Sequence, residues 1–375
     1  MFNFLKQTNE VSKLLQLPRE SKRVVFYSEG SNYWVYLSGI VKELIKFKNI
    51  QICYVSSEKN DPGLEISNGN FHSFFIDQGY PCQYLFQNIK TDVMVMTTPD
   101  LQNFHLKISK NPVHYIYIQH SLVSLHMAYN QNAFNYFDSI FCSGPHHKDE
   151  IRQIIKVNKL QHKNIIKHGY RRLDDILELP INRSKNEIPH VLIAPSWGKS
   201  GVIESIGRDL VRILLENNFK VTLRPHPQTL KFSKKIVDEI CLEFSNNNLF
   251  FFDSSIASIN SLVDSDLMIS DWSGAALDYS LGLKKPILFI DVPKKINNPN
   301  YEKINLEPIE ARLREDLGEI IRLSDIALIP KKIRHLLTNF DCGKINEIRV
   351  KNVYNLGSSD KIGAQEINKI LNTLC

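Results

Sequence analysis

Four small polar residues gather where a short apolar run gives way to a predicted helix: Ser270, Asp271, Ser273 and Gly274. The run 267–269 predicts the end of a buried strand, and residues 275–283 have the length and composition of a helix. Unpaired amides and the helix dipole favour an anion at such a helix start, and serine hydroxyls can donate to phosphate oxygens. Asp278, one helical turn further on, would reach a sugar hydroxyl. Simple helix capping by Asp271 and Ser273 is the alternative interpretation.

A second segment, Arg224-Pro225-His226-Pro227, directly follows the predicted strand 220–223. The prolines fix the backbone on both sides of His226, and the Arg224 guanidinium offers a planar fork for phosphate oxygens. A rigid arginine and histidine at a strand end are hard to explain by packing. We therefore interpret both residues as functional.

Two further segments carry histidines at predicted strand ends. His120 follows the predicted strand 114–118, where an imidazole can act as a general base near neutral pH. A buried, hydrogen-bonded histidine is the alternative for this position. His168 and Arg171 flank Gly169, which suits a tight turn, and they would either face the acceptor side of a cleft or pack at a hinge.

The segment 194–201 (APSWGKSG) also follows a predicted strand. It contains Gly-Lys-Ser, but Ile193 stands where a P-loop needs its first glycine, so the nucleotide-binding P-loop is excluded. A weaker phosphate-binding loop that uses Ser196 remains open. No His/Cys/Asp/Glu spacing matches a zinc motif, and we expect neither a metal nor another cofactor.

Strands and helices alternate along most of the chain, which predicts an α/β protein with parallel sheets. The pattern stops at the polar, proline-bounded stretch 179–190 and then restarts. We expect two Rossmann-like domains whose sheets face a cleft, with ligands at the carboxyl ends of strands. The expected boundaries are 1–180, a linker at 181–190, 191–330 and a helical tail at 331–375; helical pattern already begins near residue 307. The GxGxxG fingerprint is missing, so a dinucleotide is not indicated.

The chain has 375 residues, six scattered cysteines and a formal net charge of +6. The scattered cysteines and the lack of a signal peptide or an 18-residue apolar run predict a cytoplasmic protein. Lysine and arginine pairs form local basic patches that suit a polyanionic substrate or anionic lipid, with ordinary surface charge as the alternative. Residues 1–20 predict an amphipathic helix that docks on the protein or lies on a membrane surface. No nucleic-acid-binding motif is present.

Taken together, RPHP (224–227) and SDWSGAALDYSLGLKKPILFID (270–291) resemble the bacterial CDP-glycerol glycerophosphotransferase family, which builds teichoic acids and related capsule polymers. That family has an Arg-x-His-Pro segment, an Asp-Tyr-Ser-Ser turn, a helix with an acidic residue and a Lys-Pro-capped strand. Here Trp272 replaces the tyrosine and Gly274 the second serine. His120 matches a family histidine that is followed by glycine, and Ser121 replaces that glycine. The resemblance covers residues 115–291.

The resemblance implies a GT-B fold and a transferase that needs no metal. Such an enzyme would move glycerol phosphate, or a similar polyol phosphate, from a CDP-linked donor to a hydroxyl group. That hydroxyl would belong to a polyanionic or lipid-linked acceptor of the cell envelope. Such an enzyme would work in the cytoplasm or on the inner face of the cytoplasmic membrane. His120 would deprotonate the acceptor, and His226 would contact the diphosphate and could protonate the leaving group. Arg224, Ser196 and the Ser270–Gly274 turn would hold the donor phosphates, and Asp278 a donor hydroxyl.

Three alternatives stay open from the sequence. The first is a GT-B glycosyltransferase that uses a UDP- or CMP-sugar for capsule or lipopolysaccharide synthesis. The second is an enzyme similar to UDP-N-acetylglucosamine 2-epimerases, which share the two-domain architecture. The third is a non-catalytic nucleotide- or lipid-binding partner in envelope assembly.

Overall fold

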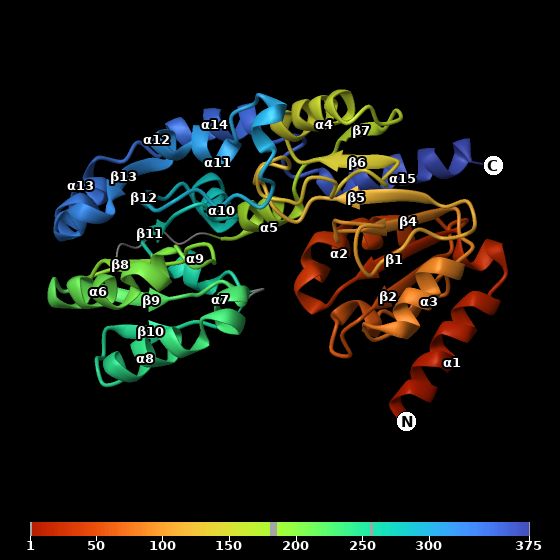
Figure 1. The fold of residues 1–375 in the computed structure, drawn as a ribbon, viewed down its shortest axis with the longest axis horizontal. Helices are drawn as coiled ribbons and strands as arrows, with labels where there is room; N and C mark the ends of the chain where they lie inside the picture. Colours follow the sequence, from red (N-terminus) through yellow and green to blue (C-terminus); the bar gives the residue numbers. More distant parts are fainter. Residues whose placement is uncertain (1, 181–185, 256–257, 375) are drawn as a thin grey trace.

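Two α/β lobes lie side by side in the computed structural model, which describes residues 2–180, 186–255 and 258–374. Figure 1 shows the first lobe in red to yellow, with the blue C-terminal helix beside it, and the second lobe in green to blue, with α5 and α10 at their junction. Of the predicted linker 181–190, residues 181–185 lie outside the described residues, and His190 already begins a strand. The α/β architecture with two parallel sheets is confirmed.

The first sheet has seven strands in the order β3-β2-β1-β4-β5-β6-β7, and every adjacent pair is parallel. Its strands are β1 (Val24–Ser28), β2 (Ile52–Ser56), β3 (Phe71–Phe75), β4 (Val93–Met96), β5 (His114–Ile118), β6 (Ser139–Cys142) and β7 (Asn164–Lys167). Successive residues of β1 face opposite hydrophobic cores, Val25 one and Phe26 the other. Both faces of the strand are therefore buried, which explains its continuous apolar sequence.

The second sheet has six strands in the order β10-β9-β8-β11-β12-β13, again with parallel pairs. Its strands are β8 (His190–Ile193), β9 (Lys220–Leu223), β10 (Phe250–Phe252), β11 (Leu267–Ser270), β12 (Ile287–Asp291) and β13 (Gly318–Arg322). Met268 and Ile269 of β11 likewise point into opposite cores. The strand order reverses beside β8, which places a ligand crevice at the carboxyl ends of the central strands.

The helices connect and cover the two sheets (Figure 1). Those up to residue 178 are α1 (Phe2–Gln16), α2 (Ser31–Ile45), α3 (Tyr80–Asn88), α4 (Pro145–Val157) and α5 (Arg171–Glu178). Those that follow are α6 (Val202–Glu216), α7 (Pro227–Phe232), α8 (Lys234–Phe244), α9 (Asn260–Asp264), α10 (Gly274–Leu283), α11 (Ile309–Arg312), α12 (Arg314–Leu317), α13 (Ile329–Asn339), α14 (Lys344–Asn352) and α15 (Ser359–Thr373).

Two strands do not appear in the sequence-based assignment, and both lie at sheet edges. In β7 both end residues are exposed, and in β13 only Ile321 is buried. Short polar edge strands lack the continuous apolar run that marks a buried strand. The expectation that the chain is helical by pattern from about residue 307 onward is therefore wrong at Gly318–Arg322.

The C-terminal segment returns to the first lobe. While α13 packs beside β12 and β13, α15 packs along α2 on the far side of the molecule. A Cβ built on Gly39 of α2 would overlap the Asp360 carboxylate of α15, so glycine is what allows this close approach. The predicted tail thus divides between the lobes, and its last helix completes the first one.

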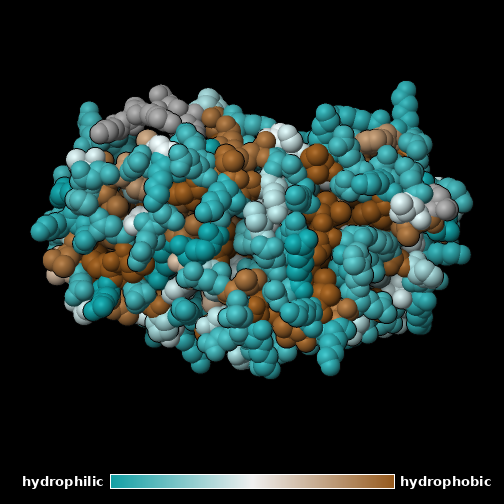
Figure 2. Space-filling view, turned by 90° about the horizontal axis from the view of Figure 1, so that it is seen from above, coloured by the Kyte–Doolittle hydropathy of each residue, from teal (hydrophilic) through white to brown (hydrophobic). Residues whose placement is uncertain are grey.

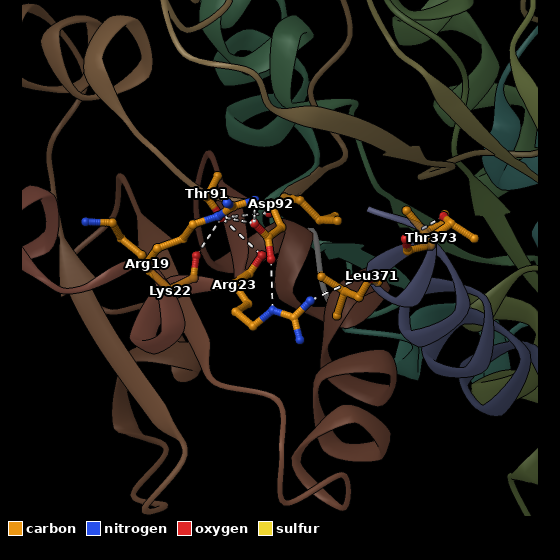
Figure 3. A network of polar contacts seen from close by, with 9 residues as sticks. Arg19, Lys22, Arg23, Thr91, Asp92, Leu371 and Thr373 are labelled. Atoms are coloured by element: carbon orange, nitrogen blue, oxygen red, sulfur yellow. Dashed lines mark hydrogen bonds and ion pairs between the residues drawn. The ribbon is translucent and has the colours of Figure 1, made fainter. Parts of the chain in front are cut away.

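A buried carboxylate ties this last helix to the start of β1 and β4 (Figure 3). Asp92 accepts hydrogen bonds from Arg19 Nε at 2.6 Å and from Arg23 Nε at 2.8 Å. Arg23 also donates through Nη2 to the Leu371 carbonyl at 3.3 Å, near the end of α15. A cation at a helix C-terminus is favourable, because the last carbonyls lack helical partners.

The N-terminal helix α1 docks on the first lobe through Val11 and Leu14, which are buried in the core beside α3. In this structure the apolar face of α1 therefore packs against the protein itself, which is the first of the two alternatives for this helix. Figure 2 shows one face of the molecule, where hydrophilic side chains surround scattered apolar patches. Within the described residues, no helix has the length and apolar character needed to cross a membrane.

Candidate functional site

A cavity of about 830 Å³ lies between the two lobes. Residues at the carboxyl ends of β1, β4 and β5 line one wall, including Glu29, Thr98 and His120. Segments that follow β8, β9 and β11 line the other wall. The predicted cleft is therefore present, at the strand ends where parallel α/β folds place their ligands.

The start of α10 is part of this cavity and touches the opposite lobe. Ser273 is the N-cap of α10, and its hydroxyl accepts from the Ala275 amide at 3.3 Å. A Cβ built on Gly274 would overlap Ser121 Oγ and lie 3.3 Å from Val123 Cγ1. Ser121 directly follows His120, so the helix start predicted to hold phosphate lies close to the predicted base.

Ser270 and Asp271 lie behind the cavity wall and join two loops. Ser270 Oγ donates to the Ala194 carbonyl at 2.9 Å, and Asp271 Oδ1 accepts from the Ser196 amide at 2.6 Å. These bonds hold the loop after β8 against the turn after β11, and Ser196, Ser273 and Gly274 line the cavity. Ser270 and Asp271 are thus placed to position the loops, and contact with the ligand falls to their neighbours.

Arg224 and His226 both line the cavity, as their position after β9 predicts. Arg224 donates to Ser261 Oγ at 2.7 Å and to the Ser258 carbonyl at 2.8 Å, which fixes its guanidinium. His226 Nδ1 accepts from the Gln228 amide at 3.1 Å, so Nε2 carries the proton of the neutral ring. Burial and the nearby Lys295 lower the pKa of His226 to about 4. The neutral ring can donate a hydrogen bond but is poorly suited to protonating a leaving group.

Lys295 adds a cation to the same wall. Its ammonium lies 4.2 Å from the centroid of the Trp197 indole, a cation–π geometry. Burial lowers the pKa of Lys295 to about 8, although Asp271 and Glu204 oppose this shift. The wall around Trp197 therefore combines an aromatic surface, two cations and a helix N-terminus, a combination suited to a nucleoside diphosphate.

His120 faces the cavity from the other lobe within a cage of tyrosines. Its Nδ1 lies 3.1 Å from Tyr117 Oη and its Nε2 3.4 Å from Tyr129 Oη. The Tyr33 ring adds an edge contact at 5.7 Å between centroids. Burial lowers the pKa of His120 to about 4, so the imidazole is neutral near pH 7. A neutral, oriented imidazole can accept a proton.

Asp278 lines the cavity from α10 and connects the lobes. Its Oδ2 accepts from Arg172 Nε at 3.0 Å and from the Tyr170 hydroxyl at 3.5 Å. Burial raises the pKa of Asp278 to about 6, although Arg172 opposes this rise. Oδ1 is buried and has no hydrogen-bond partner within the described ranges. That oxygen is available to a ligand hydroxyl.

The family described as CDP-Glycerol:Poly(glycerophosphate) glycerophosphotransferase matches residues 11–295 of this 375-residue chain. The chain belongs to this family. It is accordingly a CDP-glycerol glycerophosphotransferase-like transferase, which confirms the first of the sequence-based interpretations over its alternatives. Among curated proteins, no sequence matches the chain significantly.

Solved structures share the fold at low identity. The wall teichoic acid polymerase TagF, soaked with CDPG, is 16% identical, with 99% of this chain and 95% of that chain covered and a TM-score of 0.59. The S. aureus MnaA–UDP structure is 12% identical, with coverage of 93% and 96% and a TM-score of 0.59. WaaG, a glycosyltransferase of lipopolysaccharide biosynthesis, is 12% identical, with coverage of 92% and 99% and a TM-score of 0.52. These likenesses establish the GT-B-like fold of the glycerophosphotransferase.

Two departures from the family pattern face each other across the cleft. Ser121 stands where the resemblance implies glycine, and Gly274 stands where it implies serine, and the two residues are in contact. One hydroxyl is therefore still present at this contact, but Ser121 of the first lobe supplies it instead of residue 274 of the second lobe. The third departure, Trp272, donates from Nε1 to the Val292 carbonyl at 3.0 Å and lies beneath Arg314.

His168 and Arg171 are outside the cavity lining of the glycerophosphotransferase. His168 is buried beside Phe141, and burial lowers its pKa to about 4. Arg171 forms ion pairs with Asp175 on its own helix and with Asp360 on α15. Both residues pack where α15 joins the first lobe, which corresponds to the hinge-packing alternative for these two positions.

Several cavity residues were missed by sequence reasoning. Lys295 looked like one of several solvated lysine pairs, and Arg172 like part of a basic patch. Glu29, Tyr33 and Tyr129 carried no local motif at all. A strand-end position could have drawn attention to Glu29, which directly follows β1. The other residues reach the cavity only through tertiary packing.

Proposed function

We propose that His120 is the general base of glycerol phosphate transfer and that the wall opposite holds the donor diphosphate. The observation that carries this assignment is the contact between Ser121 and Gly274, which brings the residue after His120 to the N-terminus of α10. A phosphate on the amides at that terminus would lie between the helix dipole and the imidazole. The backbone N–H groups and the dipole at a helix N-terminus favour binding of such an anion.

In the proposed reaction, His120 accepts the proton of the acceptor hydroxyl. The nitrogen assigned to this step is Nε2, because its neighbour Tyr129 lines the cavity whereas Tyr117, beside Nδ1, does not. The acceptor oxygen attacks the phosphorus that carries glycerol, the bond to the bridging oxygen breaks, and CMP leaves with the electron pair. The histidine later returns its proton to solvent.

The donor wall stabilises the charge that develops on the leaving CMP. Arg224 and Lys295 supply positive charge, and His226 Nε2–H, Ser196 and the start of α10 supply hydrogen-bond donors. Asp278 Oδ1 would accept from a donor hydroxyl. Preorganised donors of this kind carry much of the catalysis in phosphoryl transfer, so the proposal requires no cofactor beyond the CDP-linked substrate.

A panel of donors tests this function. Release of the nucleotide would be measured from CDP-glycerol, CDP-ribitol, CMP-linked sugars and UDP-sugars, with and without a membrane-lipid or capsule-fragment acceptor. Acceptor-dependent release from CDP-glycerol supports the proposal. Release only from a sugar nucleotide would assign the site to glycosyl transfer instead.

We further propose that the acceptor polymer is lipid-linked and that the enzyme meets it at the inner face of the cytoplasmic membrane. The apolar face of α1 is occupied by docking, so contact would come from exposed basic and apolar side chains elsewhere. Phe232 on α7 and Leu242 on α8 are exposed by 66% and 78%, and lysines 231, 234 and 235 are close to them in sequence. Flotation with anionic and neutral vesicles would show charge-dependent binding, and equal binding to both would contradict this contribution of charge.

A further inference from the structure

The segment 297–310, called the crossing segment below, follows Lys295 of the donor wall and packs on the first lobe. Ile304 belongs to the hydrophobic core of that lobe, and the helical turn that ends at Ile304 contacts α4. Figure 1 shows this part of the chain in light blue beside α4. The crossing segment ends in α11, where Glu310 lines the cavity. It therefore joins the donor wall to the lobe that carries the proposed base.

The loop that directly follows His120, residues 121–127, contains neither helix nor strand. Its backbone polar groups are bound by side chains instead. Residues of α4 bind the loop from its own lobe. From the crossing segment, Asn298 Nδ2 donates to the His126 carbonyl at 2.9 Å. Buried backbone groups need partners, so these side chains determine where the backbone after the base lies.

Glu310 holds this loop at Ser124 with both oxygens of its carboxylate. Oε2 accepts from the Ser124 amide at 2.9 Å, and Oε1 accepts from the Ser124 hydroxyl at 2.7 Å. Glu310 is only 4% exposed. A buried carboxylate is costly unless it is hydrogen-bonded, and here two of its bonds go to a single residue of the loop. The contact therefore fixes both the position and the orientation of Ser124.

The residues between His120 and Ser124 are the ones that meet the start of α10. A Cβ built on Gly274 would overlap Ser121 Oγ and lie 3.3 Å from Val123 Cγ1. The Val123 amide also donates to Ser121 Oγ at 3.3 Å, which closes a short turn. This turn begins at the proposed base and is held at its far end by the carboxylate. A displacement of Ser124 would therefore move the turn and the backbone of the base together.

From this geometry we propose that Glu310 is a positioning residue for the general base, which it orients by holding the loop after His120 at Ser124. The inference rests on the proposed function and deepens it by naming a residue that sets the position of the base. Glu310 lies outside residues 11–295, the part of the chain that matches the family. Its carboxylate takes no proton from the acceptor. Its effect is geometric, and a displacement of about 1 Å at a reacting group can cost on the order of 10²-fold in rate.

Two substitutions of Glu310 test the proposal through acceptor-dependent CMP release at saturating CDP-glycerol. Glu310→Ala should lower kcat by about 10–100-fold, while the affinity for CDP-glycerol, measured by calorimetry, stays within about threefold of wild type. Glu310→Gln should recover most of this loss, because a carboxamide can accept from the Ser124 amide and donate to the Ser124 hydroxyl. An amide cannot replace a carboxylate that exchanges a proton with the acceptor. A folded Glu310→Gln variant as slow as Glu310→Ala would therefore overturn the proposal.

The His120→Ala background separates positioning of the base from general packing between the lobes. If Glu310 acts through His120, adding Glu310→Ala to His120→Ala should change the residual kcat by less than about twofold. A further fall as large as the one in the wild type would contradict the proposal, because Glu310 would then act independently of the base. Glu315→Ala removes an exposed carboxylate of α12 outside the cavity and is the matched control, with kcat unchanged in both backgrounds.

Ser124→Ala provides a milder change at the same contact. It keeps the amide bond to Glu310 and removes only the hydroxyl bond, so it decides the question if Glu310→Ala does not fold. It should lower kcat by about threefold to tenfold, as expected for one hydrogen bond, and leave the residual kcat of His120→Ala unchanged. Wild-type kcat in the folded Ser124→Ala variant would then refute the positioning role.

The proposed function and the positioning role fail differently. If His120→Ala releases CMP at the wild-type rate, the proposed function of His120 is wrong whatever the Glu310 variants do. If His120→Ala is impaired and folded Glu310→Ala is not, His120 remains the base and the role of Glu310 is wrong.

Discussion

Ser121 and Gly274 meet across the cleft so closely that a Cβ on residue 274 would overlap the Ser121 hydroxyl. The contact joins the loop that carries His120 to the helix start that is placed to receive phosphate. It also pairs two positions that each depart from the family pattern, in opposite directions. The geometry of the cleft therefore depends on these two residues together.

This contact predicts coupling between the two positions. Gly274→Ser should displace the Ser121 hydroxyl and lower kcat/KM by roughly tenfold, since overpacking costs on the order of 1–3 kcal/mol. Adding Ser121→Gly should restore most of the activity, because the double variant again has one hydroxyl in the contact. The measurement is a double-mutant cycle on CMP release. Additive effects of the two substitutions would show that the positions are independent.

Lys295 predicts an alkaline limit to donor binding. Burial lowers its pKa to about 8, so the ammonium loses its charge, and its attraction for the diphosphate, as pH rises through that value. CDP-glycerol affinity should fall roughly tenfold between pH 7 and pH 9. Lys295→Arg should abolish this fall, because guanidinium stays charged. The exposed Lys294→Arg is the matched control, and a pH dependence that survives in Lys295→Arg would exclude this lysine as its source.

The hydrogen bonds of Asp92 predict that the packing of the C-terminal helix α15 depends on this one buried carboxylate. Asp92→Ala leaves Arg23 half-buried without this partner and should lower the free energy of unfolding by about 2–4 kcal/mol. Hydrogen exchange in α15 should accelerate, because Arg23 also holds the Leu371 carbonyl. Asp149→Ala removes only an exposed pair with Arg152 at 3.9 Å and should cost less than about 1 kcal/mol. Equal losses in urea titrations of the two variants would contradict this account.

The buried environment of His120 predicts an unusual pH dependence of acceptor kcat/KM on the acid side. Its pKa is lowered to about 4, so the neutral base persists as pH falls through 6.5 and is lost only near pH 4. Acceptor kcat/KM at saturating donor should therefore show no transition near 6.5. Asp278, with a pKa of about 6, titrates nearby, so the profile is repeated in Asp278→Asn. A transition near 6.5 that persists in this variant would show that His120 titrates as an ordinary histidine.

The sequence correctly predicted those elements and cavity residues that are determined by a few consecutive residues. The strand, turn and helix around 267–283 form as expected, and Arg224, His226 and His120 reach the cavity because each follows a buried parallel strand. Lys295 could not be told from an exposed lysine, because its burial comes from packing near Trp197.

Edge strands and long-range packing account for the remaining differences between the sequence-based predictions and the structure. The polar edge strand β13 gives no apolar run, and the return of α15 to the first lobe depends on Gly39 and Asp92, which are more than 250 residues away in sequence. Ser270 and Asp271 have the side chains of ligand-binding residues, yet their hydrogen bonds are made to the loop after β8.

The most direct test of the central claim is CMP release from CDP-glycerol by His120→Ala in the presence of an acceptor. We expect kcat to fall by about 10²–10⁴-fold, as is typical for loss of a general base, while the affinity for CDP-glycerol stays within about twofold of wild type. His162→Ala, an exposed histidine on the same lobe, should turn over normally. If the folded His120→Ala variant releases CMP at the wild-type rate, His120 is not the base and the proposed mechanism is wrong.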